Sequence, residues 1–189
     1  MNEPRLAFAT QSEWDAWLEA NGSASLGVWL RLAKRSAEHP TVTYAQALEV
    51  ALCHGWIDGQ KQSEGEHHWL QRFTPRTATS IWSKINKEKA EALISAKRMR
   101  PAGFAAIERA KLDGRWDRAY TSASSSTIPD DLQQALDAHP KAKAFFATLN
   151  SRNRYAILFR IQKVKKAETR AKKIARFIEM LGNGERLHP

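Results

Sequence analysis

Tryptophan and positive charge lie in different parts of this chain of 189 residues, and that separation limits the folds it can adopt. All seven tryptophans lie within the first 116 residues. Residues 1–120 hold 17 Lys/Arg against 14 Asp/Glu, a net charge of +3, whereas residues 121–189 hold 13 against 6, a net of +7. The two compositions meet at "YTSASSSTIPDD", 120–131, a serine-rich stretch typical of a linker or long loop. We therefore predict a Trp-rich core domain over 1–120, a loop over 121–130 and a basic module over 131–189.

The first part mixes strand and helix signals. Thr10 with Glu13, and Thr43 with Gln46, have the Ser/Thr-x-x-Glu/Gln spacing of a capping box, which opens a helix. Two short strand-like runs separated by "SEGE" indicate a hairpin. The predicted elements are, in order, a strand at 6–9, a helix to about residue 20, a strand at 26–34, a helix at 44–53, hairpin strands at 55–62 and 67–73, and helices at 83–99 and 101–114.

The second part reads as helical throughout, with apolar residues three and four positions apart. Four helices are predicted, over 129–138, after Pro140, from about Ser151, and over a final stretch that ends before Gly182. The fold class that follows is α+β: a small twisted β-sheet with helices, followed by an all-helical C-terminal module.

The hairpin carries the densest group of functional residue types. Trp56 and Asp58 share one face of the first strand, and Arg72 lies on the second strand on the same face as His68 and Leu70. Two interpretations are open. Asp58 and Arg72 form a structural ion pair across the hairpin, or these residues line a polar pocket floored by Trp56 and Trp69.

The stretch "RFTPRTATSIWSKIN", 72–86, places two arginines and several hydroxyls before a helix. Guanidinium groups bind carboxylate or phosphate through paired hydrogen bonds, and the free N–H groups of a helix start attract anions. One hypothesis is a ligand site for a small anion, and the alternative is a plain N-cap with solvated arginines. The candidate ligand-binding residues are Trp56, Asp58, Trp69, Arg72, Arg76, Ser80, Ser83 and Asn86.

The basic tail is the other unusual feature. Residues 152–176 contain ten Lys/Arg and a single acidic residue, Glu168. Such a run is either a solvated helix face or a surface for a polyanion, which would be nucleic acid or an anionic membrane. The candidate polyanion-binding residues are Arg152, Arg154, Arg160, Lys163, Lys166, Arg170 and Lys173.

No familiar motif for nucleotide binding, nucleophilic catalysis or metal binding occurs in the sequence. We therefore expect no cofactor, no metal and no assigned catalytic residue; an enzyme acting on a small anionic substrate, with Asp58 as general base, is the alternative. The single cysteine, Cys53, excludes an intramolecular disulfide. Without a signal peptide or an apolar run long enough to span a bilayer, a cytoplasmic protein is expected.

Four segments carry a family resemblance that runs over nearly the whole chain. They are "ALCHGWIDGQ" (51–60), "RFTPRTATSIWSKINKEKAEALI" (72–94), "MRPAGFAAIERAKLDGRW" (99–116) and "KKAETRAKKIARFIEMLGNGE" (165–185). Together they resemble the YdeI/OmpD-associated family, also called bacteriocin-protection proteins. The resemblance implies a bacterial protein of stress or bacteriocin protection, with a helical C-terminal module and a protein partner such as a porin. With the residues above, it favours a binding protein with an anion-competent pocket; weak nucleic-acid binding by the tail is a second alternative.

Overall fold

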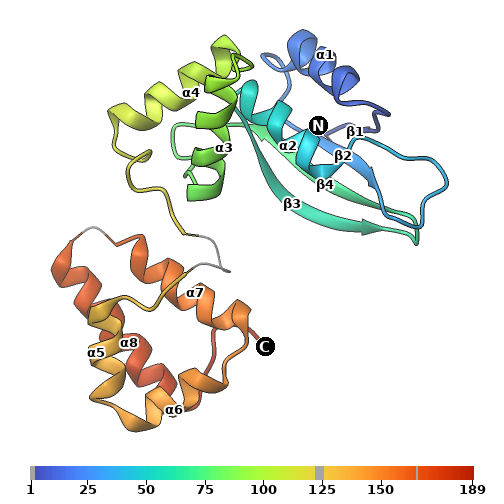
Figure 1. Cartoon of the computed structure of the whole chain (residues 1–189). Helices are drawn as coiled ribbons and strands as arrows, with labels where there is room; N and C mark the ends of the chain where they lie inside the picture. Colours follow the sequence, from blue (N-terminus) through green and yellow to red (C-terminus); the bar gives the residue numbers. More distant parts are fainter. Residues whose placement is uncertain (1–2, 122–125, 165) are drawn as a thin grey trace. The chain divides into compact units, whose positions relative to one another are not determined.

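The computed structural model describes residues 3–121, 126–164 and 166–189. The chain divides into two compact units, residues 1–119 and residues 120–189 (Figure 1). The first unit combines a mixed sheet with helices and the second is built from helices, so the predicted α+β class with an all-helical C-terminal region is confirmed.

The sheet of the first unit has four strands. They are β1 (Arg5–Leu6), β2 (Val28–Ala33), β3 (Trp56–Glu64) and β4 (His68–Pro75), in the order β1-β2-β4-β3. β1 runs parallel to β2, and the other neighbours are antiparallel. Gly65, at φ +66°, lies in the turn between β3 and β4, which is the predicted hairpin with longer strands than expected.

The predicted strand at 6–9 is shorter and begins earlier. Only Arg5 and Leu6 pair with β2, because the next residues serve other contacts. The carbonyl of Phe8 accepts a hydrogen bond from the Val42 amide at 2.9 Å, and Thr10 already caps the first helix.

Four helices complete the first unit: α1 (Gln11–Asn21), α2 (Tyr44–Cys53), α3 (Lys84–Ser95) and α4 (Pro101–Leu112). The Thr10 hydroxyl accepts from the Glu13 amide, and the reciprocal capping box at Thr43 and Gln46 is complete. The predicted start signals are therefore confirmed, and they are local, because each cap joins residues only three positions apart.

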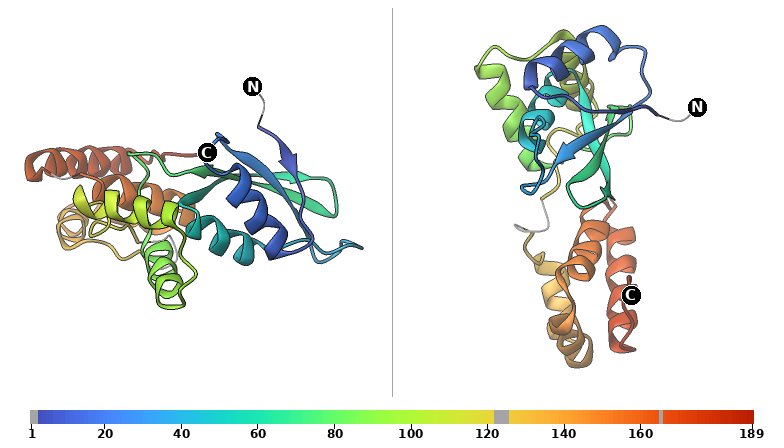
Figure 2. Two further views of the ribbon diagram at one scale, coloured as in Figure 1. Left: turned by 90° about the horizontal axis from the view of Figure 1, so that it is seen from above. Right: turned by 90° about the vertical axis from the view of Figure 1, so that its right-hand side faces the viewer.

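Helices α1 and α2 cover one face of the sheet (Figures 1 and 2). The core beneath them is aromatic. Trp14, Trp56 and Phe73 are at most 1% exposed, and the Trp14 indole donates to the Ala47 carbonyl at 3.1 Å. This core uses most of the tryptophans that the sequence concentrates in the first unit.

The second unit contains α5 (Asp130–Asp137), α6 (Pro140–Thr148), α7 (Ser151–Gln162) and α8 (Ala167–Gly182). Its core is mostly aliphatic, with Leu132, Ile157, Ile161 and Leu181 fully buried and Phe146 and Phe177 beside them. Of the loop predicted over 121–130, residues 122–125 lie outside the described residues, and α5 begins at Asp130.

Candidate functional site

The two tryptophans predicted to floor one pocket have different surroundings. Trp56 is 1% exposed and packs edge-on against Trp14 and Trp17, with ring centroids 6.4 and 6.2 Å apart. Trp69 is half-buried and lies beside Tyr44, with centroids 6.0 Å apart. Trp56 is thus part of the aromatic core, and Trp69 borders it.

The predicted ion pair between Asp58 and Arg72 is wrong. Asp58 lies opposite Phe73 in the hairpin and accepts a hydrogen bond from the Tyr44 hydroxyl at 2.8 Å. Arg72, the neighbour of Phe73 along β4, points to the opposite face because successive side chains of a strand alternate. There its guanidinium binds both oxygens of Glu3, with Nε 2.7 Å from Oε2. These hydrogen bonds lower the pKa of the Glu3 carboxyl below its ordinary value.

Arg76 is the most buried charged side chain of the 72–86 stretch. It is 6% exposed, and its guanidinium carbon lies 3.5 Å from the centroid of the Trp82 ring. One of its N–H groups donates to the Ile81 carbonyl at 3.1 Å. Trp82 in turn meets the edge of Trp116, with centroids 4.8 Å apart. Arg76 therefore stabilises the loop between β4 and α3 through its contacts with Ile81 and Trp82.

The hydroxyls of the same stretch bind backbone amides. The Ser80 hydroxyl accepts from the Thr77 amide at 2.9 Å, and the Ser83 hydroxyl caps α3 by accepting from the Asn86 amide at 3.1 Å. Ser83 is thus the N-cap of α3, as the alternative to an anion site predicted. The convergence of Arg72 and Arg76 on one anion stays a prediction, and each arginine already binds groups of the protein.

The cations of the basic tail divide into two groups. Arg170 binds Asp131 and the Ile161 carbonyl, Arg154 donates to the Ala147 carbonyl, and the Lys163 ammonium lies 4.7 Å above the Phe159 ring. Of the seven candidate polyanion-binding residues, the other four have side chains with no hydrogen-bond, ion-pair or aromatic partner among the described residues: Arg152, Arg160, Lys166 and Lys173. Polyanion binding by this group stays a prediction.

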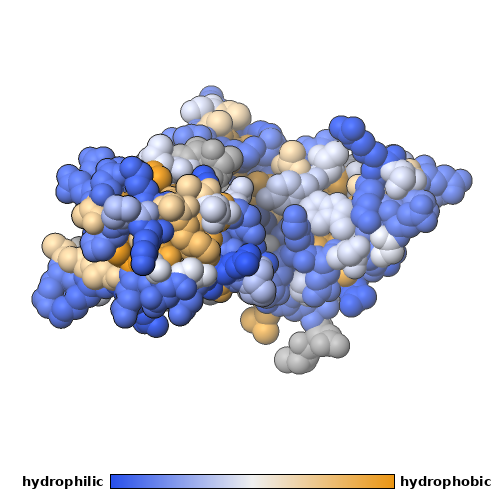
Figure 3. All heavy atoms as spheres, turned by 90° about the horizontal axis from the view of Figure 1, so that it is seen from below, coloured by the Kyte–Doolittle hydropathy of each residue, from blue (hydrophilic) through white to orange (hydrophobic). Residues whose placement is uncertain are grey.

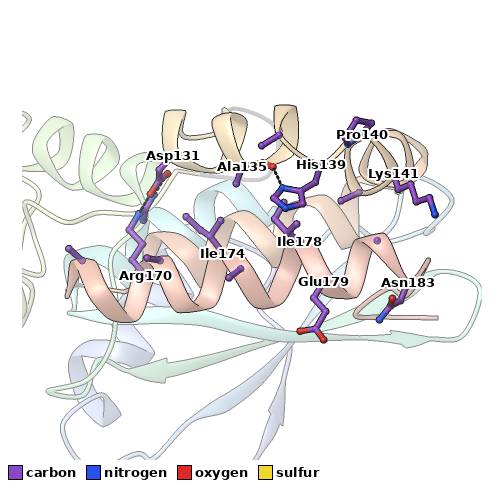
Figure 4. Close-up of a pocket in the computed structure, with 16 residues that line it drawn as sticks. Asp131, Ala135, His139, Pro140, Lys141, Arg170, Ile174, Ile178, Glu179 and Asn183 are labelled. Carbon is purple, nitrogen blue, oxygen red and sulfur yellow. Dashed lines mark hydrogen bonds and ion pairs between the residues drawn. The ribbon is translucent and has the colours of Figure 1, made fainter.

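A large hollow lies within the helical unit. It is a groove of about 870 Å³ between α8 on one side and α5 and the start of α6 on the other (Figure 4). Its lining is mostly apolar, with Ile174 and Ile178 from α8 and alanines from all three helices. Apolar surface gathers on the helical unit in Figure 3, bordered by hydrophilic side chains. The contributing alanines are Ala135, Ala138, Ala142, Ala167, Ala171 and Ala175.

Polar groups mark the two ends of the groove. At one end, Arg170 binds the carboxylate of Asp131 through two nitrogens. Toward the other end lie Lys141 and His139, and the His139 ring points toward the groove (Figure 4). Its Nδ1 lies 2.8 Å from the Ala135 carbonyl; because a carbonyl only accepts, Nδ1 carries the proton.

Our interpretation of the sequence missed this groove. Its trace in the sequence is the spacing of Ala167, Ala171 and Ala175, which places three small side chains on one face of α8. Alanine is the best helix former, so the pattern alone does not distinguish a groove from a helix chosen for propensity. The opposing wall from α5 and α6 is what makes those alanines line a hollow.

Neither a membrane-spanning helix nor a metal cluster occurs within residues 3–121, 126–164 and 166–189. No helix in these ranges has both the length and the apolar character that crossing a bilayer requires. The same residues contain no group of three His, Cys, Asp or Glu side chains placed to hold a metal ion.

Each unit corresponds to a known protein family. Residues 6–106 match the family model described as a domain of unknown function, DUF8412. Residues 125–184 match the family model described as "Bacteriocin-protection, YdeI or OmpD-Associated". No curated protein matches the chain, and no solved structure matches it.

Proposed function

Because this chain belongs to the DUF8412 family and carries a bacteriocin-protection, YdeI- or OmpD-associated domain at residues 125–184, we propose that it is a non-enzymatic binding protein. Its binding site is the groove between α5, α6 and α8, and its partner is an amphipathic helix with one apolar and one acidic side. The observation that carries the proposal is a mostly apolar groove of about 870 Å³ on the helical unit.

Apolar surface left in water is unfavourable, and a contiguous apolar hollow commonly marks a binding site. Ile174 and Ile178 contribute apolar side chains to the groove lining. Both belong to the buried core of the unit, at 6 and 7% exposed, and both also line the hollow. A leucine-sized side chain placed against them would gain about 1.5–3 kcal/mol from burial. Two or three such anchors give an affinity on the order of micromolar after the costs of association.

The dimensions of the groove favour a helix as the occupant. The lining residues of α8 run from Ala167 to Asn183, a length of about 24 Å at about 1.5 Å per residue. A partner helix of about four turns has the same length. The alanines of the lining keep the walls low, which allows the backbone of a packed helix to approach closely.

Charge favours an acidic partner. Residues 120–189 contain 13 Lys/Arg and 6 Asp/Glu, so the helical unit has a net charge of +7. The groove lining itself holds Lys141 and Arg170 against Asp131 and Glu179, so the excess of positive charge lies on the unit outside the lining. Complementary charge increases the rate of encounter and disfavours partners of like charge. A strongly cationic peptide is therefore disfavoured.

The description of the family agrees with a polypeptide partner. It names bacteriocin protection and association with OmpD, and neither term refers to a chemical reaction. The anion-competent pocket predicted near Arg72, Arg76 and Ser83 is a separate site and stays a prediction; at the groove, the anionic groups recognised are carboxylates along one side of a helix.

The proposal is tested with a labelled synthetic peptide of 16 residues. Leucines at positions i, i+3, i+4 and i+7 form its apolar side, and glutamates occupy the other side. We expect micromolar binding by fluorescence anisotropy, at least tenfold weakening by Ala175→Trp, which fills the groove, and no change with Ala144→Trp. Ala144 is exposed on α6 and is not part of the groove lining.

A second peptide with lysine in place of glutamate should bind at least tenfold more weakly. The proposal fails if neither peptide binds, or if Ala175→Trp leaves the affinity unchanged. Sedimentation of the protein alone tests whether a second copy of the chain occupies the groove instead of a partner helix. A wild-type dimer that Ala175→Trp dissociates would mean that a second copy occupies the groove, and it would contradict the acidic helix as partner.

A further inference from the structure

A second hollow lies within the first unit and has the opposite character. It measures about 430 Å³, its lining is mostly polar, and it is bounded by the first turns of α1, the end of α2 and the segment between α3 and α4. That segment contributes three cations, Lys97, Arg98 and Arg100. We propose that this pocket binds a small phosphorylated polyhydroxy compound, such as a sugar phosphate.

The two arginines are held in place but keep free donors. Arg98 binds Glu49 through a single nitrogen, at 2.9 Å, and Arg100 binds Asp15 through a single nitrogen, also at 2.9 Å. A guanidinium has five N–H donors, so each arginine can still bind a ligand oxygen. Both side chains are nearly half exposed, at 45 and 46%. A carboxylate behind each arginine restricts its orientation, which favours a fixed pair of donors.

Lys97 leaves the pocket with an excess of positive charge. Its ammonium has no ion-pair or hydrogen-bond partner among the residues that the structure describes. The lining therefore holds three cations and one carboxylate, Asp15, while Glu49 and Glu19 lie outside the lining. Burial alone would raise the pKa of Asp15, but hydrogen bonds from His54 and Arg100 outweigh it and the pKa is lowered, so this carboxylate stays ionised. The excess of positive charge in the lining suits an anion.

The backbone at Lys97 supports a functional reason for this lysine. Lys97 has φ +58°, the only left-handed non-glycine residue in the described part of the chain. It occupies the position after the end of α3 where glycine is preferred, with Arg98 N bonded to Leu93 O and Lys97 N bonded to Ile94 O. A lysine there is strained, and strain of this kind is characteristic of functional sites. The Lys97 side chain, present at this position in spite of the strain, lines the pocket.

The rest of the lining suits a hydroxylated ligand. A phosphate alone is much smaller than the 430 Å³ hollow. Gln11, Ser12 and Asp15 supply hydrogen-bond donors and acceptors beside the three cations, and such groups bind the hydroxyls of a sugar. Burial raises the pKa of the neighbouring Cys53 thiol, so this residue stays neutral and adds no charge.

The test uses the full chain, inorganic phosphate, glucose 6-phosphate and glucose. All seven tryptophans lie in the first unit, so their fluorescence reports the melting temperature of that unit. We expect both phosphates to raise this temperature in a concentration-dependent way, glucose 6-phosphate at lower concentration, and glucose to have no effect.

Variants at Lys97 separate binding from folding. Lys97→Gly should raise the melting temperature of the unliganded protein by about 4 °C, because the strain is relieved, and weaken glucose 6-phosphate binding about tenfold. Lys97→Arg should retain binding. Lys84→Ala, which removes an exposed charge outside the pocket, should leave affinity unchanged. No stabilisation of the wild type by either phosphate, or wild-type affinity in Lys97→Gly, would overturn the proposal.

Discussion

The guanidinium of Arg76 stacks on Trp82, with 3.5 Å between its central carbon and the ring centroid. A positive charge over an aromatic face is attracted to it, and the attraction is larger when water is excluded. At 6% exposure, Arg76 meets that condition. The contact explains why an arginine precedes the hydroxyl-rich stretch: it supports the corner that leads from β4 into α3.

Replacing Arg76 should therefore destabilise the first unit. We expect Arg76→Ala to lower the free energy of unfolding by about 2–4 kcal/mol, from the lost stacking and the lost hydrogen bond to Ile81. The free energy of unfolding of Arg76→Lys should lie between those of Arg76→Ala and the wild type, because lysine keeps the charge but has no planar group to stack. Urea titration followed by tryptophan fluorescence measures both. Arg109→Ala, at an exposed site on α4, is the control and should change stability by less than about 0.5 kcal/mol; an equally small effect at Arg76 would contradict a structural role.

Arg72 should be energetically coupled to Glu3 and not to Asp58. A double-mutant cycle of Arg72→Ala with Glu3→Gln should give about 0.5–1 kcal/mol of coupling, because the paired hydrogen bonds are only partly exposed. The matching cycle with Asp58→Asn should give a coupling near zero, since Asp58 binds Tyr44. Coupling of comparable size in the second cycle would mean that the two side chains meet across the hairpin after all.

The helical unit should lose stability in acid through Asp131. Hydrogen bonds from Arg170 are the main reason why the pKa of Asp131 lies below its ordinary value of 3.8. A carboxyl with a lowered folded-state pKa stabilises the fold fully above the unfolded-state pKa, and the contribution is lost as pH falls through the folded-state pKa. We expect the wild-type unit to be more stable than Asp131→Asn at pH 7, and this difference to shrink steadily as pH falls below about 4.

Circular dichroism at 222 nm during thermal unfolding measures the effect at each pH. Lys172→Gln provides the control, because both side chains of its ion pair with Glu168 on α8 are largely exposed. That variant should show little difference from wild type at any pH. If the stability difference between the wild type and Asp131→Asn did not change with pH, the side chain would stabilise the unit through packing or neutral hydrogen bonds and not through its charge.

Gly103 should tolerate no side chain although it lies in a helix. A Cβ at this position would lie 2.3 Å from the carbonyl oxygen of Cys53, which belongs to the backbone and cannot rotate away. Alanine would favour the helix by about 1 kcal/mol, but the clash outweighs this, and we expect Gly103→Ala to destabilise the first unit by about 1–3 kcal/mol. Gly182 is the helical control, because a methyl group added there would meet no described atom within 4 Å. Gly182→Ala should leave the second unit as stable as wild type or more so.

The sequence by itself determined the local structure of this protein. The capping residues Thr10, Thr43 and Ser83 predicted helix starts that the structure confirms, because each cap joins groups three residues apart. The period of apolar residues predicted the four helices of the basic part, and the "SEGE" break predicted the hairpin. These features depend on neighbours along the chain, which the sequence shows directly.

The tertiary structure decided which partner each polar side chain meets and where the surface is hollowed. Glu3, 69 positions from Arg72, could not be identified as its partner until the alignment of β1, β2 and β4 was known. The apolar groove exists only because α5 and α6 face the alanines of α8, and the polar pocket only because the segment 97–100 meets α1. Ion pairs and pockets are properties of side chains brought together from distant positions, and their positions depend on the packing of the whole unit.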